Sequence, residues 1–240
     1  MLGLGFSIPA VAARCRPGGA PIPSVISAAQ RADMSIATAT ANSSTGTYTY
    51  RYFDRATRSA RSIRGEFWNG WASPSTGEQG TGNLLPIRAA FVTSLTYASG
   101  VPAPDQAAAI LTPCTWALAA AGAADFLFKA DGTPASAADF AAAGGTLSGD
   151  ALTLGLPSNW RAVSDPTSVN LADGEGYFQQ FELDTSGSKT FPTGAMQCQG
   201  RFNDSRVLNT PNKVFDKTWP AATASGPGCG FVAVWGDSPT

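Results

Sequence analysis

The chain has 240 residues, of which 43% are hydrophobic and only 14% charged, and its formal net charge is −1. This length can bury a sizeable core, and the composition excludes a highly charged disordered chain. The chain contains no histidine, which removes the usual general base of serine and cysteine hydrolases and the commonest metal ligand. We therefore expect no enzymatic activity, no metal and no cofactor.

The charge is distributed unevenly along the chain. Residues 1–64 carry eight arginines and two aspartates, a net charge of +6, so the remainder carries −7. A basic end can dock on an acidic partner or on nucleic acid, or it can simply be a solvated arginine-rich surface. The solvated surface is preferred and nucleic acid is not an expected partner, because no nucleic-acid module pattern of aromatics and lysines accompanies the arginines.

Residues 1–46 are expected to form an extended N-terminal arm. The opening MLGLGFSIPAVAA is apolar, but it lacks the basic start of a signal peptide and is too short and interrupted to span a bilayer. A cleaved signal remains the alternative. Residues 17–46 are rich in Gly, Pro, Ser and Ala, with at most one short strand near residues 34–40. The arm residues expected to contact a neighbouring subunit or the domain's own sheet are Leu2, Leu4, Phe6, Ile8 and Val11.

Residues 47–240 are expected to fold as an antiparallel β-sandwich-like domain. The first strand signal is residues 47–53, where Tyr48, Tyr50 and Tyr52 alternate with smaller or charged residues. Three tyrosines on one strand face can form a platform for a glycan or a protein partner. The commoner explanation for such a row is a half-buried face of a sheet.

Two further strand-like runs are expected to form a hairpin. Residues 84–97 alternate with a period of two, which predicts one packed and one largely wet face. Residues 62–71 precede them and contain Trp68 and Trp71, which we place with the tyrosines as candidate glycan or partner contacts. A loop rich in Gly, Ser and Thr joins the two runs.

The remaining chain predicts one short helix and several short strands. Residues 137–143 are the best helix candidate, because Ser136 can cap its start, Asp139 follows three residues later and Gly144 can end it. Residues 109–116 and 126–130 are compatible with helix or strand. Short strand signals that favour a sandwich or open barrel recur at 151–156, 159–163, 176–183, 207–209 and 230–235.

Residues with potential chemistry give no strong motif. The loop aspartates lack the spacing of a calcium-binding loop and are adequate as turn formers. The glutamates Glu66, Glu78, Glu175 and Glu182 are available for glycoside hydrolysis, but the sequence places no two of them opposite each other. The widely spaced cysteines are compatible with two disulfides or with thiols, which are preferred; they are Cys15, Cys114, Cys198 and Cys229.

Four segments carry a resemblance to known proteins: MLGLGFSIPAVAAR, NLLPIRAAFV, GEGYFQQFELDTSGSKTFPTG and GPGCGFVAVWGDSPT. The first resembles the start of many structural proteins of tailed phages and gene transfer agents, and the other three resemble virion-associated β-sandwich proteins of phages and prophages. In that family the last segment leads into a hydrolase of the SGNH type, whose nucleophile would match Ser238 in Gly236-Asp237-Ser238. The sequence stops two residues later and has no histidine, so the resemblance implies only the non-catalytic β part.

The resemblance implies a virion structural protein: a tail, fibre or head-surface component that is assembled in the host cytoplasm. Its partners would be copies of itself and other virion proteins, with a host-surface glycan as a further candidate for attachment. No membrane span is expected. The alternatives are a secreted carbohydrate-binding module, a hydrolase fragment that uses Ser238, and an arginine-driven nucleic-acid binder.

Overall fold

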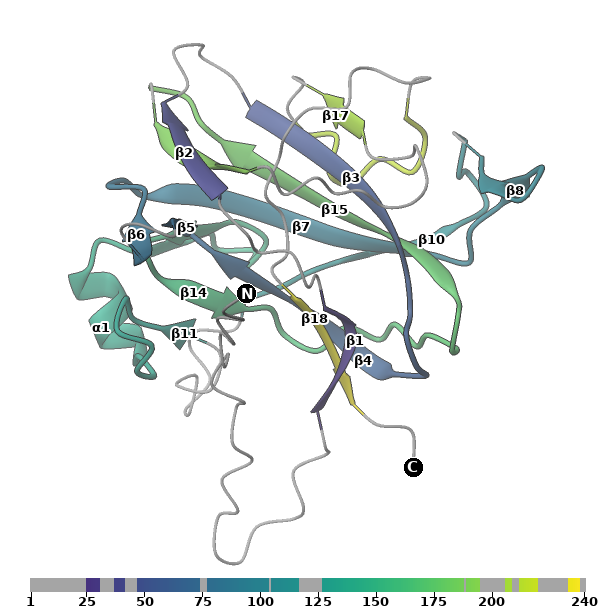
Figure 1. The fold of residues 1–240 in the computed structure, drawn as a ribbon, viewed down its shortest axis with the longest axis horizontal. Coiled ribbons are helices and arrows are strands. Elements are labelled where there is room, and N and C mark those ends of the chain that lie inside the picture. Colours follow the sequence, from purple (N-terminus) through teal and green to yellow (C-terminus); the bar gives the residue numbers. More distant parts are fainter. Residues whose placement is uncertain are drawn as a thin grey trace, which may run out of the picture.

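The computed structural model describes residues 25–30, 37–41, 47–73, 77–103, 105–116, 127–187, 189–194, 206–208, 212–219 and 233–237. These residues form antiparallel sheets with one short helix, which confirms the predicted mainly β, sandwich-like fold (Figure 1). None of the described helices is long and apolar enough to cross a membrane.

The larger sheet is seven-stranded and is built around β15. This strand, Gly176–Asp184, pairs along its whole length with β3 on one side and over six residues with β7 on the other. The order across the sheet is β12 (Thr146–Leu147), β13 (Leu154–Leu156), β7 (Leu85–Thr93), β15, β3 (Thr47–Arg55) and β17 (Arg206–Leu208), with β10 (Ile110–Pro113) also pairing with β7. The strand signals at residues 47–53, 84–97 and 176–183 therefore supply its centre.

The smaller sheet is five-stranded and contains segments from both ends of the described chain. Its order is β1 (Val25–Gln30), β18 (Ala233–Asp237), β4 (Arg61–Trp68), β14 (Arg161–Val163) and β11 (Leu127–Phe128). Three two-stranded ribbons complete the fold: β2 (Ala37–Ala41) with β16 (Thr190–Gly194), β5 (Gly70–Ser73) with β6 (Gly77–Gly80), and β8 (Tyr97–Ala98) with β9 (Val101–Pro102).

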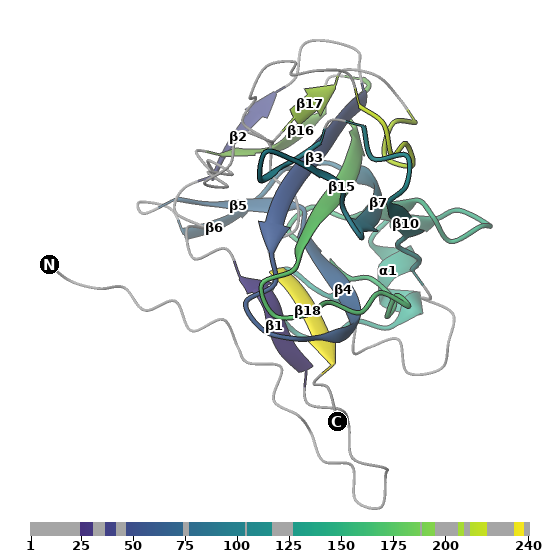
Figure 2. The same ribbon diagram turned by 90° about the vertical axis from the view of Figure 1, so that its right-hand side faces the viewer.

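The main hydrophobic core takes side chains from both large sheets. Figure 2 shows the ribbon of β3, β15 and β7 from one sheet and of β1, β18 and β4 from the other. Phe67 of β4 meets Phe181 of β15 edge-on, with ring centroids 5.8 Å apart. Phe181 also stacks on Tyr50 and Tyr52 of β3, so these three aromatic residues of the seven-stranded sheet face the five-stranded one. Inward-facing side chains alternate along each strand, as the period of two requires.

The predicted hairpin between residues 62–71 and 84–97 is wrong. β4 belongs to the five-stranded sheet, whereas β7 belongs to the seven-stranded one, and the chain between them folds into the β5–β6 ribbon. The predicted face pattern of β7 holds only in its first half, where Leu85 and Ile87 are buried and Arg88 is half-buried. From Ala89 onward every residue is buried, because a second apolar cluster with Phe53, Phe178 and Ala109 covers Val92 on the outer face.

Two segments of the predicted N-terminal arm are strands of this fold. β1 pairs with β18, and β2, which overlaps the short strand expected near residues 34–40, pairs with β16. The arm residues from Leu2 to Val11 lie outside the described residues. The part of residues 1–46 that is described is therefore attached to the sheets by main-chain pairing.

The helix is where its sequence signals predict it. α1 spans Ala137–Ala142; the backbone N–H of Asp139 donates to the hydroxyl of Ser136, and the Asp139 carboxylate accepts from the Ser136 N–H. Gly144 follows with a φ of +79°, the left-handed conformation that ends a helix at little cost only in glycine. Phe140 is the residue that buries the helix against the core.

Replacing Ser136 by alanine is expected to lower the free energy of unfolding by about 1 kcal/mol, because the first turn of α1 loses its side-chain acceptor. Urea unfolding followed by far-UV circular dichroism measures the loss. Ala138→Ser is the control, because Ala138 is exposed on the same helix and its substitution leaves the cap intact. We expect it to change the free energy of unfolding by less than about 0.5 kcal/mol. Equal effects from the two substitutions would contradict a specific role of the cap.

Candidate functional site

Among the described residues, the most extensive group of polar contacts lies on the outer face of the seven-stranded sheet and is centred on Arg51. Arg51 is on β3 at a position opposite to the core-facing Tyr50 and Tyr52, yet it is only 1% exposed. Its guanidinium lies 4.8 Å from the ring centroid of Phe178 and 4.6 Å from that of Trp219. The cation is therefore enclosed by two aromatic rings, an arrangement that favours a planar guanidinium.

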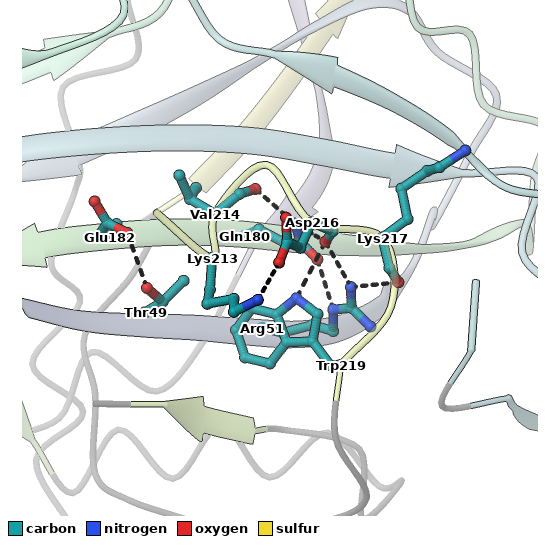
Figure 3. A network of polar contacts seen from close by, with 9 residues as sticks. All are labelled: Thr49, Arg51, Gln180, Glu182, Lys213, Val214, Asp216, Lys217 and Trp219. Atoms are coloured by element: carbon teal, nitrogen blue, oxygen red, sulfur yellow. Dashed lines mark hydrogen bonds and ion pairs between the residues drawn. The ribbon is translucent and has the colours of Figure 1, made fainter. Parts of the chain in front are cut away.

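The hydrogen bonds of Arg51 connect the sheet to residues 212–219 (Figure 3). Its Nε donates to Oε1 of Gln180 at 2.6 Å, and its Nη2 donates to the carbonyl oxygens of Asp216 and Lys217 at 3.0 and 2.8 Å. Gln180 in turn donates to the carbonyls of Val214 and Asp216, and the indole of Trp219 donates to the carbonyl of Asp216. We call Arg51, Gln180, Trp219 and these three carbonyls the Arg51 clamp.

Contacts at both ends of residues 212–219 reinforce the clamp. The ammonium of Lys217 donates to the carbonyls of Ala107 and Ala109 at 2.6 and 3.0 Å. At the other end Arg88 donates to the side chain of Asn212 and forms an ion pair with Glu182, whose second oxygen accepts from Thr49 at 3.0 Å. Glu182 is 3% exposed, and its buried charge is thus paired and hydrogen-bonded.

The chemical role that this arrangement supports is positioning of a surface segment. Arg51 and Gln180 donate hydrogen bonds to acceptors within the protein, and most of those acceptors are backbone carbonyls of residues 214–217. A catalytic group instead needs a nucleophile and a base that can reach a substrate. The Arg51 clamp thus holds residues 214–217 on the sheet.

A second group of polar and aromatic side chains lies on the outer face of the five-stranded sheet. Ile63 and Phe67 of β4 point into the core, so Glu66 between them points outward. Its Oε2 accepts a hydrogen bond from the indole of Trp235 on β18 at 2.7 Å. On β14 the guanidinium of Arg161 lies 4.9 Å from the ring centroid of Trp68. We call Glu66, Trp68, Arg161 and Trp235 the Glu66 face.

Glu66 is 8% exposed although it faces outward, and its burial raises the pKa of its carboxyl above the usual range. The hydrogen bond from Trp235 and the charge of Arg161 act in the opposite direction but are smaller effects. Arg161 also forms an ion pair with Glu78 at 2.7 Å, so its charge is not directed at Glu66 alone. The folded protein therefore favours the protonated form of Glu66 more than the unfolded chain does.

Glu66→Gln is expected to raise the free energy of unfolding at pH 7 by roughly 1 kcal/mol, because the neutral amide avoids the burial penalty and still accepts from Trp235. Because the pKa of Glu66 is higher in the folded state, the cost of burying its charge is complete above the folded-state pKa and disappears below the unfolded-state pKa. The difference in the free energy of unfolding between Glu66→Gln and wild type should therefore shrink as the pH falls. Urea unfolding between pH 4 and pH 8 measures this. Asp173→Asn is the control at an exposed carboxylate. A stabilisation by Glu66→Gln that is independent of pH would contradict the assigned cause.

The structure places the predicted tyrosine platform mostly inside the protein. Tyr50 and Tyr52 are 2% and 1% exposed and belong to the core, and Tyr48 is half-buried against Phe191. Tyr50 and Tyr52 therefore lie on a packed face of the sheet, which was the other explanation for the tyrosine row. Their buried rings present no surface on which a glycan could stack.

The two candidate tryptophans are separated by Asn69 and Gly70. Trp68 is 7% exposed; its indole donates to Asn159 at 2.9 Å, and its edge lies so close to Gly70 that a Cβ there would come within 2.4 Å of it. Trp71 lies on β5 opposite Gln79, and its side chain lies outside the described residues, as do the arm residues Leu2, Leu4, Phe6, Ile8 and Val11. The structure thus brings none of the predicted contact residues together at a described open surface.

Three of the loop aspartates considered as metal ligands form turns. The carboxylates of Asp131, Asp150 and Asp184 each accept from a backbone N–H two residues later, as turn formers do. Within the described part of the chain no three potential metal ligands come together. Cys114 is a free, buried thiol whose pKa is raised by burial to about 12, and the other cysteines lie outside the described residues.

The sequence interpretation missed the Arg51 clamp. Arg51 was visible only as the charged member of an alternating strand, and its partners are the polar residues of another strand, 129 positions away, and a distant loop. The sequence did contain one signal: polar Gln180 and Glu182 alternate with apolar Phe181 and Leu183. It indicates polar groups on one face of β15, but not which strand would lie beside them.

The first two residues of the Gly236-Asp237-Ser238 motif end β18. The carboxylate of Asp237 lies 3.6 Å from the guanidinium of Arg64. Ser238 lies outside the described residues. The motif thus begins within a strand of the five-stranded sheet. Comparison of the chain with protein-family models, with curated proteins and with solved structures finds no match.

Proposed function

We propose that this chain is a structural protein of a tailed phage or phage-like particle that acts by assembling with copies of itself and with other virion proteins. The observation that carries the proposal is the Arg51 clamp. The most extensive set of buried polar contacts in the described chain is used to fix a surface segment on the sandwich. A protein that acts by presenting surfaces to neighbours needs such segments in one conformation.

The position of the resembling segments supports the same proposal. NLLPIRAAFV contributes β7, and GEGYFQQFELDTSG contributes β15; these are adjacent central strands of the seven-stranded sheet. The resemblance to virion-associated β-sandwich proteins therefore concerns the centre of the fold.

An exposed apolar projection gives further support. Among the described residues the exposed large hydrophobic side chains are Tyr97, Val101 and Ile110, which lie on the β8–β9 ribbon and at the start of β10. Gln106 is fully buried and holds this region through hydrogen bonds with the backbone of Thr96 and Ala103. Figure 1 shows the ribbon projecting from the body. A rigid apolar projection fits a contact with a neighbouring protein.

Sedimentation of the native source material, with mass spectrometry of each fraction, tests the proposal. We expect the chain to sediment with large particles. Recovery only as a small species at the top of the gradient would overturn it. Val101→Asp should weaken particle association without unfolding the chain, whereas the exposed Ala138→Asp on α1 serves as a control for added surface charge.

A secreted carbohydrate-binding module is the second candidate, favoured by the Glu66 face. Glu66 and Trp68 of this face are buried, but Trp235 and Arg161 are partly exposed on the same face. An accessible indole together with a charged side chain is what glycan sites use. Glycan screening of the wild type and of Trp235→Ala tests this function. Binding that depends on Trp235, with the chain absent from particles, would favour the module.

A further inference from the structure

The first and last described strands form one edge of the five-stranded sheet. β1 pairs antiparallel with β18, from Val25 opposite Asp237 to Gln30 opposite Ala233. On its other side β18 pairs with β4. Both views show the two strands side by side at the end of the molecule away from β17 (Figures 1 and 2).

β18 is held in place by contacts that do not involve β1. Val234 is part of the core, the indole of Trp235 donates to Glu66 on β4, and Asp237 pairs with Arg64 of the same strand. These contacts remain if β1 is removed. The edge of β18 is therefore a preformed acceptor for one more strand.

β1, in contrast, is attached through its backbone at the periphery. Among the described residues its strand pairing is with β18 alone. Its sequence, VISAAQ, contains neither proline nor a charged residue, so nothing in it blocks or repels pairing with an identical copy of the acceptor. Main-chain hydrogen bonds do not distinguish the copy from which a strand comes.

We propose that β18 also accepts residues 25–30 of a neighbouring copy, so that copies are linked by exchange of β1. This inference rests on the proposed function and names the contact through which copies would join. The exchanged strand makes the same register of bonds as the strand it replaces, which is why swapping of an identical element is a low-cost route to association.

Disulfide trapping between two full-length variants tests the exchange. One population carries Gln30→Cys and the other, labelled with ¹⁵N, carries Ala233→Cys; these residues are register partners. The two are refolded together and mildly oxidised, and the cross-linked peptide is identified by mass. Val25→Cys paired with Ala233→Cys is the matched control, because Val25 lies opposite Asp237, four residues or roughly 13 Å along β18 from Ala233, beyond the reach of a disulfide.

A 30–233 link between the two populations, without a 25–233 link, is the expected result. A third variant that carries Gln30→Cys and Ala233→Cys in one chain shows whether the register itself exists. A link within this chain, with none between populations, would overturn the exchange, as would equal linking in the control. The assay uses purified chain, so its outcome is independent of the sedimentation result that tests the proposed function.

Discussion

Arg51→Ala is expected to lower the free energy of unfolding by about 3 kcal/mol and to release residues 212–219 from the sheet. The substitution removes the Arg51 donor from Gln180 Oε1 and from the carbonyl of Lys217, and the carbonyl of Asp216 keeps only its donors Gln180 and Trp219. It also opens a gap between Phe178 and Trp219. Urea unfolding measures the first effect. Limited trypsin digestion measures the second, because Lys213 and Lys217 are cleavage sites within the segment.

Two matched variants show whether the geometry of Arg51 is required. Arg51→Lys keeps the charge but cannot bond Gln180 and the two carbonyls together, so it should recover only a minor part of the loss. Arg55→Ala removes an exposed arginine of the same strand and should change stability by less than about 0.5 kcal/mol. Unchanged tryptic cleavage in Arg51→Ala would mean that other contacts hold the segment, and the clamp would lose its assigned role.

Phe181→Ala is expected to destabilise the fold by about 3–5 kcal/mol, the usual cost of deleting a buried aromatic ring. Phe181 is fully buried, with its ring centroid 4.8 Å from that of Tyr50, 5.4 Å from that of Tyr52 and 5.8 Å from that of Phe67. It thus joins both sheets, and its removal leaves a cavity at their interface. Chemical denaturation followed by tryptophan fluorescence gives the loss.

The controls for Phe181 separate cavity formation from a general effect of substitution. Phe181→Leu fills part of the space and should cost clearly less than alanine. Ile110→Ala alters a side chain that is 57% exposed and should leave the free energy of unfolding nearly unchanged. If Phe181→Ala cost less than about 1 kcal/mol, the ring would not be a main contact between the sheets.

The parts of the fold that the sequence predicts are those determined by neighbouring residues. Ser136, Asp139 and Gly144 define α1 because a capping box and a left-handed end residue depend only on positions a few residues apart. Likewise the alternation of residues 176–183 is sufficient to predict β15. Local signals of this kind need no knowledge of the rest of the chain.

Pairing between strands could not be predicted in the same way. β4 and β7 are close in sequence and both apolar, but each finds its partners elsewhere, because burying the aromatic residues of both requires them to face each other across the core. The buried state of Arg51 depends on a loop more than 160 residues later, as the separations of its bonds to Asp216 and Lys217 show. An exposed arginine would have given the same alternating pattern in the sequence.

The pairing of β15 with β3 has a consequence for synthesis on the ribosome. Arg51 and Gln180 are 129 residues apart, and at about 5–20 residues per second the ribosome needs roughly 6–26 s to bridge them. During this interval β3 lacks its full-length neighbour, because β15 is not yet made. The aromatic face of β3 must meanwhile be shielded by collapse onto earlier segments or by a chaperone, so the nascent chain should be most prone to aggregation before Asp184 has emerged.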